Sequence, residues 1–452
     1  MKSHLEPLPI ELIEHIVIFL PLDDIASLRL TSRAMEHKAS QGSFATFFKH
    51  KDVELTTTTL QDMLRLTSRG RLGCLLEHCN ITCVVRSDTT AVDEGADQDL
   101  RTLLSEAFRN LKLRSSNGGL ASLCLRVVAR IEDADGELEE PDYFGDWKSV
   151  WSTALRTFQI TMGALQDSQL SVEDLDIFGG LKGCSLACDA FLAFAQQSIS
   201  RPVFGSVKRL TMSLSVSPAA ATDPESGNLR RGTDAHAQSR HSQLLLRDLL
   251  QVLHIMPQLE SLDVHWYNLG EKAPFAPPFP SDPQLENSIS PGSVPCLKEC
   301  SLRGIHVSES DLLHFLEAIR PSAVTLTNIR LISGTYASIL RYLTDPKTPV
   351  TMYDLDDNCE QNTKLVHFEV PGNPKFKYIG GNVGPSSIVR RGSQAKEAIS
   401  YRLPPGRVIG AGERNRWLKA TSEEFGPLDG HYNFVGLNRV GVLISDDDSD
   451  YD

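Results

Sequence analysis

The chain lacks long hydrophobic runs and an excess of positive charge. No apolar run approaches the ~18 residues of a membrane-spanning helix, and Pro21 interrupts the longest candidate. The 45 Lys and Arg against 58 Asp and Glu give a net charge of −13, which argues against nucleic acid and anionic membranes as main partners. The first residues show no continuous apolar region of the signal-peptide kind. We therefore expect an intracellular protein, cytoplasmic or nuclear.

A cysteine framework is also missing. The nine cysteines are an odd number and include no CxxC pair, so we expect reduced, mostly buried thiols. Cys296 and Cys300 lie near His306 and His314, which suggests zinc. However, Cys300 falls on an inward position of a strand pattern, so we assign it to the core and predict no metal site.

Catalytic motifs are absent as well. The sequence contains no GxSxG elbow, no P-loop and no HExxH, and 410–412 lacks the third glycine of a dinucleotide fingerprint. Carboxylates such as Glu137 and Glu139 fall in segments that predict loops, where no rigid catalytic pair is held. We predict no catalytic residues, no cofactor and no enzymatic activity. A cryptic enzyme in the α/β part is the least favoured alternative.

An apolar helical stretch stands at the amino-terminal end. Leu8, Leu12, Ile16 and Leu20 recur every fourth residue, as on one face of a helix. Pro21 ends that helix. A segment of roughly 40 residues cannot bury this much apolar surface on itself. Either the remaining chain or a partner covers it.

A second and a third helix are predicted directly after Pro21. Asp23 or Asp24 can cap the second helix and Ser32 the third. The stretch as a whole resembles an F-box, with one departure at Met35, where many members carry an aromatic residue. The residues that carry the resemblance are Leu8-Pro9, Glu11-Leu12, Ile13, Ile16, Leu20, Asp24-Ile25, Leu28, Arg29, Thr31, Ser32 and Arg33.

The resemblance implies a partner. F-boxes bind the small Skp adaptor of cullin-RING ubiquitin ligases, and through it a cullin scaffold. The implied adaptor-binding residues are Leu8, Pro9, Leu12, Ile13, Ile16, Leu20, Ile25 and Leu28.

Strand-like and helix-like pieces alternate through the middle of the chain. The strands share an apolar-x-x-apolar-x-apolar pattern. The copies are Leu120/Leu123/Leu125, Val172/Leu175/Ile177, Val207/Leu210/Met212, Leu259/Leu262/Val264, Leu297/Cys300/Leu302, Leu365/Phe368/Val370 and a weaker Val324/Leu326. Helical stripes lie between them. They begin near Leu100, Trp151, Leu246, Leu312 and Tyr336, the Leu312 helix being preceded by a Ser308/Asp311 capping pair.

Repeated strand–helix units stack into a solenoid because none buries its apolar face alone. The clearest step, from Cys300 to Val324, falls within the 20–29 residues of leucine-rich repeats, but Ile305 and Ile329 replace the signature asparagine. The segment 297–343 resembles the degenerate repeats behind F-boxes in fungal proteins. We expect an α/β fold: a three-helix F-box, then an irregular leucine-rich-repeat-like solenoid. The alternative is a non-solenoid α/β domain.

These patterns give three regions. We predict an F-box at 1–48, a repeat domain at 49–370 with surface loops at 132–146, 217–241 and 270–295, and an irregular carboxyl-terminal region at 371–452. In the last region Trp417, Phe425, Tyr432 and Phe434 suggest packing onto the domain, and an acidic tail from Asp446 suggests disorder. The segment Arg390-Arg391-Gly392-Ser393 fits a recognition motif of basophilic kinases.

Residues between the apolar strand positions point to the opposite face of the sheet. In a solenoid they line the concave recognition surface. The predicted substrate-binding residues are Asp263, His265, Ser301, Arg303, Thr325, Thr327, His367 and Glu369. The alternative is a solvated polar face without a partner.

The resemblance and the missing active site together predict a substrate receptor of an SCF-type ubiquitin ligase. Such a receptor holds an unidentified protein substrate and acts by proximity. The alternative is an interaction scaffold that contacts the same adaptor without a ubiquitylation role.

Overall fold

The computed structural model describes residues 5–85, 94–130, 138–139, 141, 147–181, 183–197, 201–215, 246–267, 294–360, 364–379, 382–404, 408–409 and 411–425. The predicted loops at 132–146, 217–241 and 270–295 fall mostly outside these residues, as do Tyr432, Phe434 and the acidic tail. Within the first loop, strand β4 (Leu138–Glu139) pairs antiparallel with β3.

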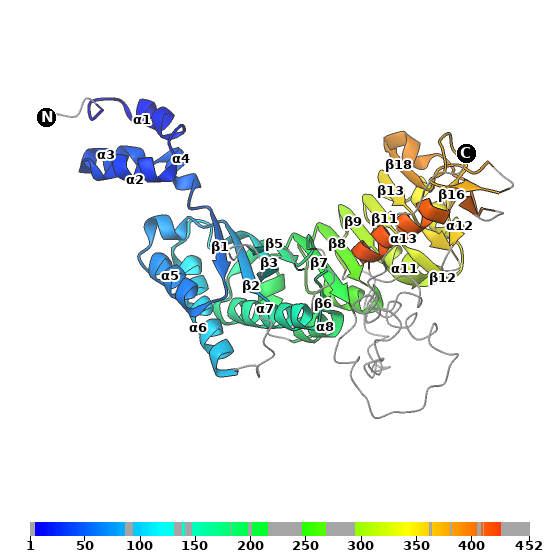
Figure 1. The fold of residues 1–452 in the computed structure, drawn as a ribbon, viewed down its shortest axis with the longest axis horizontal. Coiled ribbons are helices and arrows are strands. Elements are labelled where there is room, and N and C mark those ends of the chain that lie inside the picture. Colours follow the sequence, from blue (N-terminus) through cyan, green and yellow to red (C-terminus); the bar gives the residue numbers. More distant parts are fainter. Residues whose placement is uncertain are drawn as a thin grey trace, which may run out of the picture.

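Four short helices form the amino-terminal unit, which stands apart at one end of the molecule (Figure 1). They are α1 (Ile10–Val17), α2 (Leu22–Leu30), α3 (Arg33–Ala39) and α4 (Gly42–Thr46). Ser32 caps α3, as predicted, by accepting a hydrogen bond from the Met35 amide. Neither Asp23 nor Asp24 caps α2, because Pro21 holds the N-cap position and places both aspartates inside the helix.

The amino-terminal unit has a small hydrophobic core of its own. Ile13, Val17, Ile25, Met35 and Phe44 are buried together, with Leu8, Ile16, Leu20 and Leu28 packed around them. Met35, which stands in place of an aromatic residue, is fully buried.

A large sheet forms the body. Among the described residues it has twelve strands, and its main path follows the order of the chain, parallel throughout except for the last strand. The path is β1 (His50–Glu54), β2 (His78–Val84), β3 (Gly119–Arg130), β5 (Ser171–Ile177), β7 (Arg209–Ser215), β8 (Ser261–Tyr267), β9 (Glu299–Arg303), β11 (Ala323–Thr327), β13 (Met352–Asp356) and β18 (Ser387–Arg391), with β4 and β6 (Leu186–Ala187) off it.

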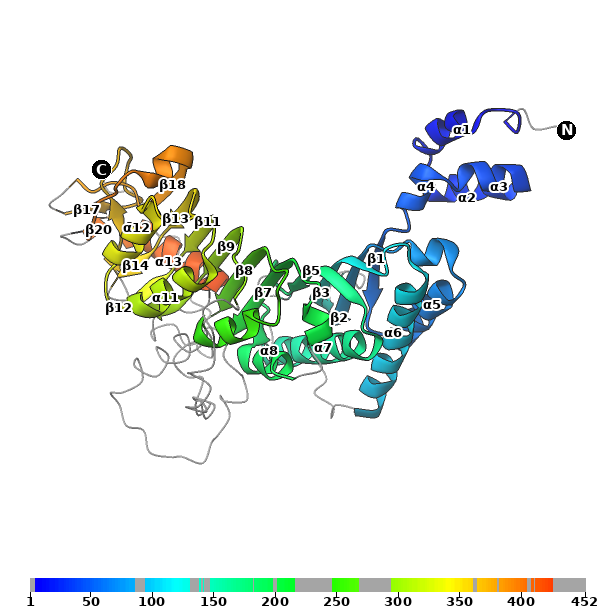
Figure 2. The ribbon, with the colours of Figure 1, turned by 180° about the vertical axis from the view of Figure 1, so that it is seen from behind.

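Helices cover one face of this sheet (Figures 1 and 2). They are α5 (Thr57–Ser68), α6 (Glu94–Arg114), α7 (Trp147–Ser168), α8 (Cys188–Ala195), α11 (Glu309–Ile319) and α12 (Tyr336–Thr344). The inward strand residues and the helix stripes form one continuous apolar core, which includes Cys300 as predicted. No helix in the described part of the chain is long and apolar enough to cross a membrane.

The predicted strands and helices are largely confirmed, with one error and several omissions. The Leu365/Phe368/Val370 copy is not a strand of the main sheet. The chain reverses there, since β14 (Cys359–Glu360) pairs antiparallel with β15 (Lys364–Leu365). The last parallel strand is instead β13, which was not predicted, and neither were β1 and β2.

Smaller sheets complete the carboxyl-terminal end. A second sheet has the order β10 (His306–Ser308), β12 (Arg330–Ser333), β14 and β15, and two strand pairs are β16 (His367–Phe368) with β19 (Tyr401–Arg402) and β17 (Lys377–Tyr378) with β20 (Val408–Ile409). Phe368 is buried because it packs on the main core from this position.

Three consecutive strands end in the same sharp turn. Gly304, Asn328 and Asp357 follow β9, β11 and β13, and their φ angles are 72°, 52° and 49°. Glycine, asparagine and aspartate tolerate this left-handed conformation better than other residues. The turn directs the next residue under the sheet, where Ile305 and Ile329 are fully buried.

Asn358 occupies the corresponding place after β13. Its Oδ1 accepts a hydrogen bond from the Ile329 amide and its Nδ2 donates one to the Leu326 carbonyl, both at 2.9 Å. The sequence analysis found no such asparagine because it missed β13. The side chain ties two successive turns of chain together.

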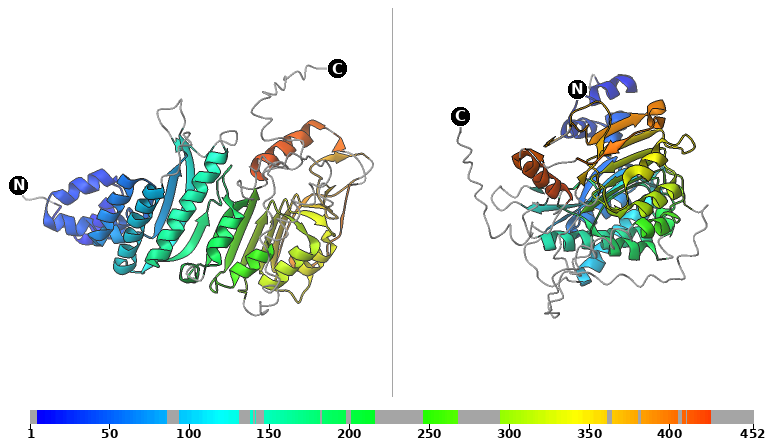
Figure 3. Two further views of the ribbon diagram at one scale, coloured as in Figure 1. Left: turned by 90° about the horizontal axis from the view of Figure 1, so that it is seen from below. Right: turned by 90° about the vertical axis from the view of Figure 1, so that its right-hand side faces the viewer.

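Helix α13 (Ala411–Phe425) crosses the carboxyl ends of the strands (Figure 3). Trp417 Nε1 donates to Asp357 at 2.9 Å, and the Phe425 ring packs edge-on against His265. Lys375 and Ser386 also donate to Asp357. The predicted packing of Trp417 and Phe425 onto the domain is thus confirmed.

Candidate functional site: two surfaces at different ends of the chain

Large apolar side chains are exposed on the amino-terminal helices. Phe19 and Leu30 are 83% and 88% exposed, and Leu12 is 48% exposed. We call Leu12, Ile18, Phe19, Leu22 and Leu30 the F-box surface. Burial of such residues is worth roughly 1.5–3 kcal/mol for each side chain, so a complementary partner gains substantially by covering them.

The predicted adaptor-binding residues divide into three groups. Leu12 and Pro9 are exposed and accessible to a partner. Leu8, Ile16, Leu20 and Leu28 are half-buried against the unit's own core. Ile13 and Ile25 have no exposed surface. In this conformation the last two shape the helix packing and cannot touch a partner.

The predicted adaptor-binding residues do not include Ile18, Phe19, Leu22 or Leu30. The helix α1 ends at Val17 and a turn follows, so Ile18 and Phe19 leave the helical stripe and become exposed. The signal was the unbroken apolar run up to Pro21, which a single helix face cannot bury.

Side chains of α3 and α2 fix the exposed segment. Lys38 Nζ donates to the carbonyls of Glu6 and Leu8, at 2.7 and 2.6 Å. Arg29 donates to Ser40 Oγ at 2.8 Å and lies 4.3 Å above the Phe44 ring. These contacts fix the segment before α1 and the packing of α2 on α3 and α4.

The amino-terminal unit is attached to the body at one junction. Phe48 packs edge-on against Phe44, 5.0 Å away, and Leu72 of the body joins the same apolar cluster. Lys49 pairs with Glu77 at 2.8 Å. The neighbouring Phe47 is half exposed.

The second surface is the face of the main sheet opposite helices α5 to α12, here called the open face. Strand pairing places its outward residues in three rows. The first row is His50–His78–Ser122–Asp174–Arg209–Ser261–Glu299–Ala323–Met352–Arg391, and the second is Asp52–Asn80–Cys124–Asp176–Thr211–Asp263–Ser301–Thr325–Asp354–Val389. The third row has two parts, Glu54–Thr82–Arg126 and Ser213–His265–Arg303–Thr327–Asp356–Ser387.

Five predicted substrate-binding residues come together on this face. Asp263, Ser301 and Thr325 are neighbours in the second row, and Arg303 and Thr327 are neighbours in the third. Arg303 forms an ion pair with Asp263 at 3.2 Å. Both partners are about one-third exposed, so the pair is available to a ligand.

The other three predicted residues are placed differently. His265 lies in the third row but is only 7% exposed, because Phe425 of α13 covers it. His367 is fully buried in β16, where Tyr378 and the Gly384 carbonyl contact its ring nitrogens. Glu369 follows the same small strand and pairs with Arg402. Neither His367 nor Glu369 belongs to the open face.

The centre of the open face carries shifted pKa values. Burial raises the pKa of Asp176, and the Gly179 amide opposes the shift by donating a hydrogen bond. Burial also raises the pKa of the neighbouring Cys124 to about 11, and the Asp176 charge adds to this. At the far end, burial and then the charge of Asp356 raise the pKa of Asp354.

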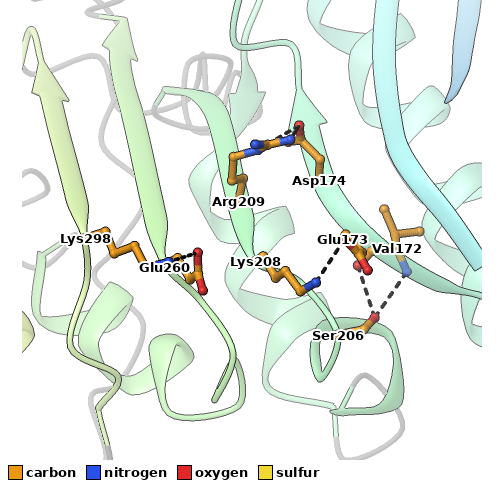
Figure 4. Close-up of polar contacts among 8 residues, drawn as sticks. All are labelled: Val172, Glu173, Asp174, Ser206, Lys208, Arg209, Glu260 and Lys298. Atoms are coloured by element: carbon orange, nitrogen blue, oxygen red, sulfur yellow. Dashed lines mark hydrogen bonds and ion pairs between the residues drawn. The ribbon is translucent and has the colours of Figure 1, made fainter. Parts of the chain in front are cut away.

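Ion pairs border the open face at the amino ends of the strands (Figure 4). Glu173 lies in β5, and Lys208, Glu260 and Lys298 directly precede β7, β8 and β9, so that the charges alternate. Lys208 pairs with Glu173 at 3.0 Å and Lys298 with Glu260 at 2.7 Å. Arg209 pairs with Asp174 one residue further in, at 2.8 Å. Mutual pairing makes this border nearly neutral, so it repels neither sign of charge.

In the part of the chain that the structure describes, no group of three or more His, Cys, Asp or Glu side chains has the arrangement of a metal site.

Comparison with known families identifies the amino-terminal unit. Residues 5–41 match the F-box domain, and F-box domains bind the Skp adaptor of SCF ubiquitin ligases. The chain thus contains an F-box domain, which indicates a substrate-adaptor role through the Skp contact. No curated protein matches the chain.

Proposed function

We propose that this protein is the substrate-recognition subunit of an SCF-type cullin-RING ubiquitin ligase, active inside the cell in the cytoplasm or nucleus. The F-box surface binds the Skp adaptor and the open face binds a protein substrate. The chain itself carries out no chemistry. It raises the effective concentration of substrate near a ubiquitin-conjugating enzyme.

The observation that carries this proposal is the F-box match over a unit with an exposed apolar surface. A monomeric protein does not gain from exposing Phe19 and Leu30 almost completely. Lys38 holds the segment before α1 through the Glu6 and Leu8 carbonyls, which reduces the entropy that ordering Leu8 and Pro9 would cost on binding.

We further infer that the body is a leucine-rich-repeat-like solenoid. Its support is the strand order, which follows the chain, and the spacing between register partners: 24 residues from Cys300 to Val324 and 29 from Val324 to Tyr353. Asn358, which bridges two turns, has the role of the signature asparagine of such repeats. The fungal character of the resemblance stays a prediction.

The open face supports substrate binding by its composition and position. Most of its outward residues are polar, helices α5 to α12 lie on the other face of the sheet, and α13 covers the part around His265. Figure 1 places it between the F-box unit at one end and the carboxyl-terminal segments at the other. Solenoids commonly use this face for recognition.

The test is reconstitution of the full chain with purified Skp adaptor, cullin, RING protein, ubiquitin-activating and ubiquitin-conjugating enzymes. We expect a stoichiometric complex, and ubiquitylation of proteins captured from cell extract that stops when Phe19 and Leu30 are both changed to Ala. Failure of the full chain to bind the adaptor would refute the ligase role.

A scaffold without ubiquitylation remains the second candidate. It predicts the same adaptor complex but a captured partner whose abundance does not depend on the F-box. Comparing the half-life of the captured protein in cells with the wild-type chain and with the Phe19→Ala/Leu30→Ala variant separates the two functions.

A further inference from the structure

The last strand of the main sheet carries two adjacent arginines at the edge of the sheet. In β18, Arg390 pairs with Tyr353 and Arg391 with Met352 of β13. The other side of β18 has no neighbour along the main path of the sheet. Two residues later comes Ser393, which is exposed.

The two arginines face opposite ways. Arg391 belongs to the first row of the open face, and its charge opposes the upward shift of the Asp354 pKa. Arg390 points to the helix-covered side, where its Nη1 pairs with Glu397 at 2.6 Å and lies 3.5 Å from the Gln394 carbonyl. Arg390 therefore contacts the turn that holds Ser393, and Arg391 stands on the open face two residues before the serine.

The turn is the short 3₁₀ helix η4 (Gly392–Lys396), which is anchored at both ends. Gly392 has a φ of 58° with open space around its Cα, and its amide donates to the Thr351 carbonyl at 2.8 Å. Beyond Ser393, Ala395 is fully buried and Lys396 Nζ donates to the carbonyls of Asp345 and Thr348. Within the described residues the Ser393 hydroxyl makes no hydrogen bond, so lifting it out of the turn breaks few contacts.

We propose that Ser393 is a phosphorylation site for an arginine-directed protein kinase. Arg390 and Arg391 stand three and two residues before the serine and are already extended at an open sheet edge, the form in which a kinase cleft with acidic subsites can bind them. With ATP as co-substrate, the Ser393 oxygen forms a bond to the γ-phosphorus. The bond from that phosphorus to the bridging oxygen of ADP breaks, and the serine proton passes to the kinase's base.

Among the described residues, the other hydroxyls with an arginine three residues earlier are Ser32, Ser68 and Thr344, which cap or lie in helices, and Ser333, which lies in strand β12 after the buried Arg330. Ser32, which follows Arg29, caps α3 through the Met35 amide. Thr344, which follows Arg341, donates to the Leu340 carbonyl at 2.8 Å. These sites are blocked by structure. Thr233, in Arg230-Arg231-Gly232-Thr233, has the same motif but lies outside the described residues.

The phosphate would change the end of the open face. It carries about −1.5 to −2 charges and three strong acceptor oxygens. Arg390 then exchanges Glu397 for the phosphate, and Arg391 is drawn toward it and away from Asp354. The modification makes the far end of the open face more acidic, and it would disfavour acidic ligands there.

The experiment uses the full chain, ATP and the catalytic subunit of cyclic-AMP-dependent protein kinase as the arginine-directed probe, with sites mapped by mass spectrometry. We expect phosphate on Ser393 and not on Ser32 or Thr344. Ser393→Ala should abolish that site, Thr233→Ala should leave it unchanged, and Arg390→Gln/Arg391→Gln should lower its initial rate about tenfold or more. Arg402→Gln, which removes a charge outside the motif, should leave the rate unchanged.

One variant tests the geometry and not only the motif. Glu397→Gln removes the acceptor that holds Arg390, so the kinase no longer competes with an internal ion pair, and the initial rate at Ser393 should rise severalfold. The proposal would be overturned if phosphate were found only at Thr233. It would also be overturned if the initial rate of phosphorylation at Ser393 were the same in Arg390→Gln/Arg391→Gln as in the wild type. A rate that Glu397→Gln lowers or leaves unchanged would overturn the role given to the Arg390–Glu397 pair.

Discussion

The Nε2 atom of His265 lies 2.9 Å from the backbone oxygen of Glu424 and joins strand β8 to helix α13 across 159 residues of sequence. The Ser213 hydroxyl lies 3.3 Å from Nδ1 on the other side of the ring. One nitrogen therefore donates and the other accepts, which is the pattern of a neutral imidazole. Burial, and then the charge of Arg303, lower the pKa of His265 to about 4.

This neutral histidine predicts acid sensitivity. An unfolded chain binds the proton near pH 6.5 and the folded chain only near pH 4, so the contribution of His265 to stability is full above 6.5 and is lost as the pH falls through this window. The loss amounts to about 3 kcal/mol. Urea unfolding between pH 7 and 4 should show a shallower pH dependence in His265→Gln than in the wild type. Parallel pH curves for the two proteins would contradict the prediction.

We expect a single methyl group added at Gly304 to lower the free energy of unfolding strongly. An added Cβ would lie 2.5 Å from the Trp266 carbonyl oxygen and 2.6 Å from Phe425, at a φ of 72°. Gly304→Ala should therefore lower the free energy of unfolding by more than about 3 kcal/mol and detach α13 from β8. Gly392→Ala is the matched control, since its φ is 58° but nothing lies within 4 Å. That variant should cost only about 1–2 kcal/mol of left-handed strain. Equal losses in the two variants would refute the contact argument.

We expect removal of the buried side-chain amide of Asn358 to lower the free energy of unfolding substantially. In Asn358→Ala the Ile329 amide and the Leu326 carbonyl lose their partners inside the protein. We expect a loss of about 2–4 kcal/mol in the free energy of unfolding, measured by chemical denaturation. Asn80→Ala serves as control because its bond to Asp52 is exposed, and it should cost less than about 1 kcal/mol. A loss of that small size in Asn358→Ala would remove the asparagine from its bridging role.

The F-box surface predicts which side chains carry adaptor binding. Leu12→Ala, Phe19→Ala and Leu30→Ala should each weaken binding of the Skp adaptor by about 1–2 kcal/mol, or roughly five- to thirtyfold in Kd. Leu113→Ala removes an equally exposed leucine from the body and should leave Kd unchanged. Calorimetric titration of the full chain with purified adaptor measures all four. A uniform affinity across the series would place the contact elsewhere.

Much of the fold could be predicted because its signal is local. The apolar-x-x-apolar-x-apolar pattern located β3, β5, β7, β8, β9 and β11, because the inward positions of a covered sheet must be apolar. The same rule misplaced Leu365 and Phe368. Phe368 packs on the main core from another direction, and Leu365 packs in a small separate cluster with Cys359 and Phe376. The spacing of apolar residues shows which side chains are buried, but it does not show to which sheet a strand belongs.

The candidate site was less predictable because exposure depends on distant segments. The positions of Asp263 and Arg303 on the open face follow from alternation along a strand. The burial of His265 does not, because Phe425 covers it from 160 residues further along the chain. In the F-box, a stripe alone could not separate Ile13, which is buried, from Leu12, which is exposed.

The order of the main strands has a consequence for how the protein opens. Each strand contacts only its predecessor and its successor, so the body is stabilised mainly by nearest-neighbour terms. Opening then spreads from the two ends and is opposed by contacts that reach past a neighbouring strand, such as Trp151 of α7 against Ser215 and Tyr267, and by α13, which spans β8 to β13. Amide hydrogen exchange should accordingly be graded along the molecule, fastest at β1 and slowest among the strands that α13 bridges.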